Sequence, residues 1–144
     1  MGILTNIVAA DEEEIVAVAH SLRPIDEWSG LEKRGIDAGK IVVLHCLLTG
    51  DDFETSVSQY EPVYISSEGV VILRIADALF EKLATLDEEA LGCVAYELGA
   101  TEEYEKENWD PADVHDMVME LADLARIADS QTQLLLVWMH PLVT

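Results

Sequence analysis

An apolar, strand-like segment lies at each end of the sequence, and this pair restricts the folds that the chain can adopt. Residues 2–9 read GILTNIVA and residues 133–139 read QLLLVWM. Both are typical of short strands, and we expect His140 and Pro141 to stop the second one. A hairpin turn cannot join strands so far apart in the chain. We therefore predict that they pair in one small sheet with helices packed against it.

Helical periodicity dominates the sequence between these two strands. Apolar residues spaced by three and four, with capping residues at the ends, predict helices over about residues 11–22, 37–50, 66–83, 85–99 and 110–128. The third of these helices is predicted from the spacing of Ile72, Ile75, Leu79 and Leu83. The predicted fold class is α+β, with a small sheet that includes the N- and C-terminal strands packed against four to five helices.

The remaining segments read as connections. Residues 24–36 mix proline, glycine and charged residues, and residues 51–61 are polar, so both are predicted loops. Residues 62–65 read as a short extended piece. The β-branched run at residues 41–43 leaves a strand as the alternative to the second helix.

The composition predicts one acidic globular domain over residues 1–144. Half of the 144 residues are hydrophobic, and the mean hydropathy is +0.17, which is enough for a core. Acidic residues outnumber basic ones by 29 to 8, so the net charge is −21. This charge repels nucleic acid and anionic membranes and attracts a basic protein. The alternative is that the acidity only keeps the protein in solution.

The same sequence predicts a cytoplasmic protein without a cofactor or a bound metal. Cys46 and Cys93 lie in apolar stretches, which is typical of reduced thiols in a cytosolic protein. No signal peptide is apparent, and the longest apolar run is far short of the roughly 20 residues that span a bilayer. Phosphate-binding, nucleophile-elbow and zinc-ligand motifs are missing from the sequence.

One histidine stands in the most apolar helix and is the first candidate for chemistry. Residues 41–52 read IVVLHCLLTGDD. A functional interpretation makes His45 a general base or ligand beside the turn formed by Thr49, Gly50, Asp51 and Asp52. The alternative is a semi-buried histidine whose ring N–H satisfies a backbone carbonyl. Asp51 and Asp52 also raise the prospect of a weak divalent-cation site, although the order of ligands does not match an EF-hand.

The densest charge lies in residues 97–129, where eleven acids face only Lys106 and Arg126, for a net charge of −9. The functional interpretation is a docking face for a basic protein, with two aromatic residues as anchors. The alternative is an ordinary solvated face, with the aromatic rings covering the core. The predicted contact residues are Glu102, Glu103, Tyr104, Glu105, Trp109, Asp113, Asp116, Glu120 and Asp123.

The order of these features resembles the YfbM-like bacterial family, a domain of unknown function. The resemblance rests on the opening MGIL, on LHCLLTG at residues 44–50, on residues 64–66, on residues 105–109 and on the last helix and strand. Where the family usually has a tryptophan four positions before the histidine, this chain has Ile41. The resemblance implies a small α+β domain from a bacterial cytoplasm and draws attention to His45, Thr49 and Gly50.

Three functions follow as expectations. The first is a non-enzymatic protein-interaction module, of the immunity or inhibitor type, that binds a basic partner. The second is a small-ligand or hydrolytic site around His45 and the turn at residues 49–52. The third is the weak divalent-cation site.

Overall fold

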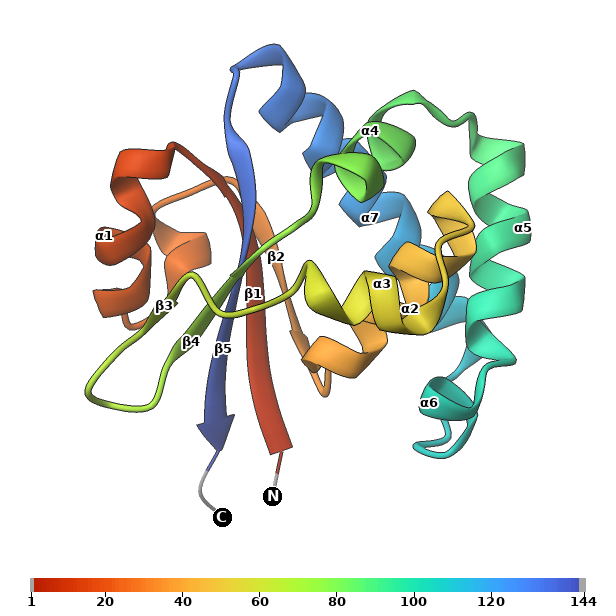
Figure 1. Cartoon of the computed structure of the whole chain (residues 1–144), viewed down its shortest axis with the longest axis horizontal. Helices are drawn as coiled ribbons and strands as arrows, with labels where there is room; N and C mark the ends of the chain where they lie inside the picture. The colour runs from red at the N-terminus through yellow and green to blue at the C-terminus, as the bar shows by residue number, and fades with distance from the viewer. Residues whose placement is uncertain (1, 143–144) are drawn as a thin grey trace.

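The computed structural model describes residues 2–142, and its centre is a five-stranded antiparallel sheet. The strands lie in the order β2-β1-β5-β4-β3, so the two long strands at the ends of the chain occupy the middle (Figure 1). Their bounds are β1 Gly2–Ala10, β2 Gly30–Arg34, β3 Tyr64–Ile65, β4 Val71–Arg74 and β5 Leu134–Leu142.

The predicted pairing of the two terminal strands is confirmed. β1 and β5 are antiparallel over their whole length, from Gly2 opposite Leu142 to Ala10 opposite Leu134. The expectation that His140 and Pro141 end the second strand is wrong, because β5 continues through both. A proline has no N–H to donate to a neighbouring strand. Pro141 lies beyond the last pair between β4 and β5, Val71 with Met139, so among residues 2–142 only β1 pairs with β5 at this position.

Helices cover both faces of the sheet. The larger layer packs on one face, and a smaller layer packs on the other (Figure 1). The larger layer contains α2 Ala38–Thr49, α3 Phe53–Ser58, α4 Asp77–Thr85, α5 Glu88–Gly99, α6 Glu102–Glu105 and α7 Pro111–Ser130. The smaller layer contains α1 Ile15–His20 and the 3₁₀ turns η1 Glu12–Glu14 and η2 Pro24–Asp26. The predicted α+β class is confirmed, with seven α-helices in the described residues instead of four to five. No helix among residues 2–142 has the length and apolar character needed to cross a bilayer.

Alternation along β1 distributes its side chains between two hydrophobic clusters. Ile7 and Ala9 pack with the larger helical layer, whereas Val8 and Ala10 pack with α1. All four side chains are buried. Successive residues of a strand point to opposite faces, so a sheet covered on both sides needs apolar residues at consecutive positions. This requirement explains the consecutive apolar residues at positions 7–10 of β1 and 134–139 of β5.

Three elements differ from the predictions made from sequence. The loop predicted at residues 24–36 contains β2, and the polar segment at residues 51–61 contains α3. The helix predicted over residues 66–83 is instead β4 followed by α4. Ile72 and Leu73 are both buried because they face opposite, covered sides of the sheet. The spacing of Ile72 to Ile75, Leu79 and Leu83 nevertheless imitates a helical repeat. The helix predicted over residues 11–22 ends at His20, and Leu22, which lies beyond it, is 91% exposed.

Aspartate caps determine where the longer helices begin. The Asp37 side chain accepts a hydrogen bond from the backbone N–H of Lys40, and Asp52, Asp87 and Asp110 cap α3, α5 and α7 in the same way. An N-cap oxygen satisfies a backbone donor that has no partner within the helix. The capping residue of α5 is Asp87, whereas the sequence pattern had indicated Thr85. At the other end of α2, Gly50 adopts a left-handed φ of 79°, which confirms the predicted end of that helix.

Replacing Gly30 with alanine is expected to destabilise the fold. A Cβ at this position would collide with the backbone oxygen of Ile7 and would lie 2.7 Å from Val8 Cγ1. The strands β1 and β2 would have to separate, and overpacking of this kind costs about 1–3 kcal/mol. Urea unfolding should show this loss.

Gly39→Ala is the matched control: the nearest atom to its Cβ is 3.4 Å away, so it should raise the free energy of unfolding by about 0.5–1 kcal/mol through helix propensity. Equal effects of the two substitutions would contradict the close approach at Gly30.

Candidate functional site

His45 lies on α2 and is completely buried, with 0% of its surface exposed. Its Nδ1 is 2.9 Å from the hydroxyl of Tyr60, and its Nε2 is 2.8 Å from Oδ2 of Asp51. A carboxylate only accepts hydrogen bonds, so Nε2 carries a proton and donates it to Asp51, and Nδ1 shares a hydrogen bond with the tyrosine hydroxyl. The predicted backbone-carbonyl partner is therefore wrong, because the ring is held by two side chains. Tyr60 had not been identified from the sequence.

The turn after α2 holds the carboxylate in place. The Thr49 hydroxyl donates to the backbone oxygen of His45 at 2.7 Å and accepts from the backbone N–H of Asp51 at 3.2 Å. Gly50 supplies the left-handed residue that this turn requires. The structure thus brings together His45, Thr49, Gly50 and Asp51, as predicted. Asp52 does not join them, because its side chain caps α3 through the backbone N–H of Thr55 at 2.7 Å.

The electrostatics of this cluster stabilise a charged aspartate beside a protonated tyrosine. The hydrogen bond from His45 lowers the pKa of Asp51 below its ordinary value. Burial raises the pKa of the Tyr60 phenol, so that it remains protonated. The rings of His45 and Tyr60 also pack edge to face, with an interplanar angle of 81° and centroids 5.5 Å apart. A general base needs a nitrogen that a substrate can reach, and here both nitrogens bind protein groups in a ring without exposed surface. The network joins α2 to α3 and to the segment that follows it.

Acidification is expected to remove the contribution of this carboxylate to stability. The pKa of Asp51 is lower in the folded protein than its ordinary value of 3.8, so its stabilising effect is complete above that value and is lost as the pH falls below it. Urea unfolding of the natural protein and of Asp51→Asn should therefore show a difference at pH 7 that shrinks below about pH 4. A difference that stays constant across this range would show that the Asp51 charge does not stabilise the fold. Asp113→Asn is the control, because that acid has no ion-pair or side-chain partner among the described residues.

The predicted acidic contact residues lie on α6 and α7. We call seven of them the acidic ridge: Glu102, Glu103, Glu105, Asp113, Asp116, Glu120 and Asp123. The α7 members are exposed, on the side opposite the buried face of the helix. Figure 1 shows α6 at the end of the molecule where α7 begins. Within the described residues, only Glu120 and Asp123 have a lysine or arginine within ion-pair distance: Lys33 at 3.6 Å and Arg126 at 3.1 Å.

The two aromatic residues of the predicted face have a different role from the one expected. Tyr104 is only 1% exposed, so it cannot anchor a partner on the surface. The ring of Trp109 packs edge-on against it, with centroids 5.4 Å apart, and is partly buried against the core. The interpretation of these rings as surface anchors is therefore wrong for Tyr104, and Trp109 acts as a cover over it. Hydrophobic burial in this short, charged segment is what holds α6 to the core.

A buried lysine is the main polar feature that the sequence did not reveal. Lys40 is 1% exposed, and its ammonium group binds the carboxylate of Glu107, lies 3.7 Å from Asp37 and sits 5.9 Å from the centre of the Tyr104 ring. A buried ammonium group requires partners of this kind. Lys40 and Glu107 are 67 positions apart, and no local pattern connects residues so distant in the chain. The lysine links α2 to the segment between α6 and α7.

The divalent-cation alternative receives no support from the described residues. Among residues 2–142, no group of three or more histidine, cysteine, aspartate or glutamate side chains is arranged to hold a metal ion. Asp51 is bound to His45 and Asp52 caps α3, so the two acids of the turn point to different partners. Calcium and magnesium sites require several oxygen ligands that converge on one point.

The chain is similar to a solved protein whose function is unknown. Neither a protein-family model nor a curated protein sequence matches it. Among solved structures, the crystal structure of YfbM from Escherichia coli, a protein of unknown function, matches with 16% sequence identity and a TM-score of 0.46. The match covers 95% of this chain and 99% of that chain. A similarity at this level assigns neither a family nor an activity, so membership of the YfbM-like family stays a prediction from the sequence.

Proposed function

We propose that this chain is a non-enzymatic interaction module, of the immunity or inhibitor type, that binds a basic protein through its acidic ridge. The single observation that carries the proposal is the lack of internal neutralisation along the ridge. Five of its seven carboxylates have no lysine or arginine within ion-pair distance in the described part of the chain. Surface carboxylates without a counter-charge create a negative potential that steers a basic partner toward them.

The form of α7 supports the proposal. The helix is 20 residues long, and buried residues such as Val118, Leu121 and Ala125 fix one side of it against the core. Its acids therefore project from a rigid element. A partner that binds them does not have to order a flexible loop, and this lowers the entropic cost of association. The buried His45, by contrast, provides no accessible atom for the alternative of a hydrolytic site.

Affinity capture with matched charge variants tests this function. The ridge variant carries Asp113→Asn, Asp116→Asn and Glu120→Gln. The control variant carries Glu12→Gln, Glu13→Gln and Glu61→Gln, which remove the same charge from exposed acids outside the ridge. We expect the natural chain and the control to retain the same basic protein at low salt, and the ridge variant to lose it. Binding should also fall as the salt concentration rises, because salt screens exposed charges over about 10 Å at 0.1 M.

Two results would contradict the proposed function. One is the retention of the same partner by the ridge variant, which would place the contact elsewhere. The other is an equal loss in both variants, which would reduce the effect to net charge. Circular dichroism and thermal unfolding of each variant establish that the fold is unchanged. Purification of the retained protein and a direct titration then give the affinity and its salt dependence.

A further inference from the structure

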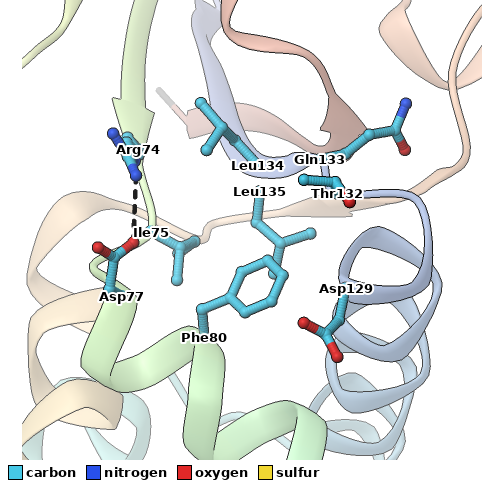
Figure 2. A pocket seen from close by; sticks show the side chains of 9 residues that line it. All are labelled: Arg74, Ile75, Asp77, Phe80, Asp129, Thr132, Gln133, Leu134 and Leu135. Carbon is cyan, nitrogen blue, oxygen red and sulfur yellow. Dashed lines mark hydrogen bonds and ion pairs between the residues drawn. The ribbon is translucent and has the colours of Figure 1, made fainter.

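A second feature lies where α7 turns into β5, apart from the acidic ridge. A cavity of about 270 Å³ opens there between the start of α4, the end of α7 and the end of β4. Pockets for small molecules are usually roughly 300–1,000 Å³, so this one suits a single side chain or a small organic group. Its lining is Arg74, Ile75, Asp77, Phe80, Asp129, Thr132, Gln133, Leu134 and Leu135 (Figure 2).

The charges of the lining are unequal. Arg74 is already bound, because its guanidinium donates to Asp77 Oδ1 at 3.1 Å, and Figure 2 shows this pair on one side of the cavity. Asp129 enters from α7 on the other side, and its carboxylate has no ion-pair or hydrogen-bond partner among the described residues. One guanidinium and two carboxylates leave the cavity with an excess negative charge. A ligand that enters the cavity would therefore contact the unpaired carboxylate of Asp129.

The position of Asp129 adds to this negative potential. It stands in the last turn of the 20-residue helix α7, and this turn contains no basic residue. The C-terminus of a helix carries a partial negative charge and normally favours cations, so a carboxylate there is unfavourable by itself. A cation bound at Asp129 would be stabilised by both the carboxylate and the helix terminus. The C-terminus of α7, where a positive charge would stabilise the helix, therefore lies at the cavity.

The rest of the lining selects the kind of cation. Phe80 presents its ring between Asp129 and the Arg74–Asp77 pair (Figure 2), and Ile75 and Leu135 are buried beside it. An aromatic face attracts a cation within about 6 Å of its centre, and apolar walls accept an aliphatic stem. A divalent metal would need more ligands than one free carboxylate. The geometry points to a binding site for an alkylguanidinium or alkylammonium group, with its head on Asp129 and its stem along Phe80.

Titration of the full chain with butylguanidinium, followed by two-dimensional NMR, tests this site. We expect saturable shifts in the backbone amides of residues 75–80 and 128–135. Asp129→Asn should weaken binding by about tenfold or more, as loss of a charge-assisted hydrogen bond does. Phe80→Leu should weaken it by about threefold. Glu61→Gln is the control, since it removes the same charge from an exposed residue outside both the cavity and the acidic ridge, and it should change the affinity by less than about twofold.

The comparison ligands separate this site from simpler explanations. Butanol tests for a merely apolar pocket, and butyrate tests for an anion site at Arg74. The inference is overturned if butylguanidinium produces no saturable shift in these amides, if butanol or butyrate binds as tightly, or if Glu61→Gln weakens binding as much as Asp129→Asn. Asp129→Asn should fold normally, because removing an anion from a helix C-terminus slightly favours the helix.

The same titration with the peptide acetyl-Gly-Arg-Gly-amide identifies the source of the cation. Tighter binding of the peptide than of butylguanidinium assigns the cavity to an arginine side chain of a protein, and the reverse assigns it to a free organic cation. Both results support the site. Failure of both ligands overturns it and leaves the acidic ridge untouched, because the ridge variants do not change this cavity.

Discussion

His45→Ala is expected to lower the free energy of unfolding by about 3 kcal/mol or more, the largest effect we predict for a single substitution. Removing a buried ring leaves a cavity, and the loss of large buried aromatic side chains costs about 3–5 kcal/mol. The substitution also leaves the buried hydroxyl of Tyr60 without its partner on the imidazole ring, and an unpaired buried polar group costs about 1–3 kcal/mol. Chemical denaturation at pH 7 measures the loss. A large loss would show that His45 serves to hold Tyr60 and Asp51 in the folded structure.

The control for this experiment is His20→Ala. His20 is also helical and also contacts a tyrosine hydroxyl, Tyr64, at 3.2 Å, but it is exposed. Surface substitutions usually change stability by about 0.5 kcal/mol or less. If His45→Ala proved no more destabilising than His20→Ala, the buried network would contribute little, and a role for His45 outside folding would have to be sought.

Glu107→Gln is expected to destabilise the protein by about 2 kcal/mol or more, whereas Lys40→Met should change its stability by no more than about 1 kcal/mol. The asymmetry arises from burial. The ammonium group of Lys40 is enclosed, but the Glu107 side chain is 48% exposed and can be hydrated. Loss of the carboxylate leaves a buried charge with only the more distant Asp37. Loss of the lysine leaves two acids in contact with water and replaces its stem by an apolar side chain of similar length.

A double-mutant cycle measures this coupling. The double variant Lys40→Met/Glu107→Gln should be about as stable as Lys40→Met alone, because the unpaired charge is no longer present. Glu105→Gln is the matched control for the glutamate, since it is exposed and two residues away. A double variant as unstable as Glu107→Gln, or a loss in Lys40→Met equal to that in Glu107→Gln, would contradict the proposed asymmetry.

Features carried by consecutive residues could be predicted from the sequence. The apolar terminal runs predicted β1 and β5 and their pairing, and Asp110, Pro111 and the apolar spacing that follows predicted α7 with its buried face. Asp37 and Gly50 likewise predicted both ends of α2. These signals are local, because caps, turns and periodicity depend on residues within a few positions of each other.

Two strands that were not predicted from the sequence, β2 and β4, form because of the elements that pair with them or cover them. β2 has the sequence GLEKR and a single buried residue, Leu31. It forms a strand because its backbone pairs with β1. The sequence pattern assigned β4 to a helix, because Ile72 has a helical spacing to Ile75, Leu79 and Leu83, whereas in the structure Ile72 and Leu73 lie on opposite, covered faces of the sheet. Strand propensity depends strongly on such context.

The same division holds for the candidate sites. By itself, the sequence determined the two central strands, the long helices, the acidity of α7 and the turn that carries Asp51. Tertiary structure alone decided that His45 meets Tyr60, that Lys40 meets Glu107, that Tyr104 is buried, and that Asp129 and Phe80 share a cavity. The physical reason is that a buried polar or charged group requires a partner without prescribing its place in the chain. The packing of distant helices on one sheet supplies that partner.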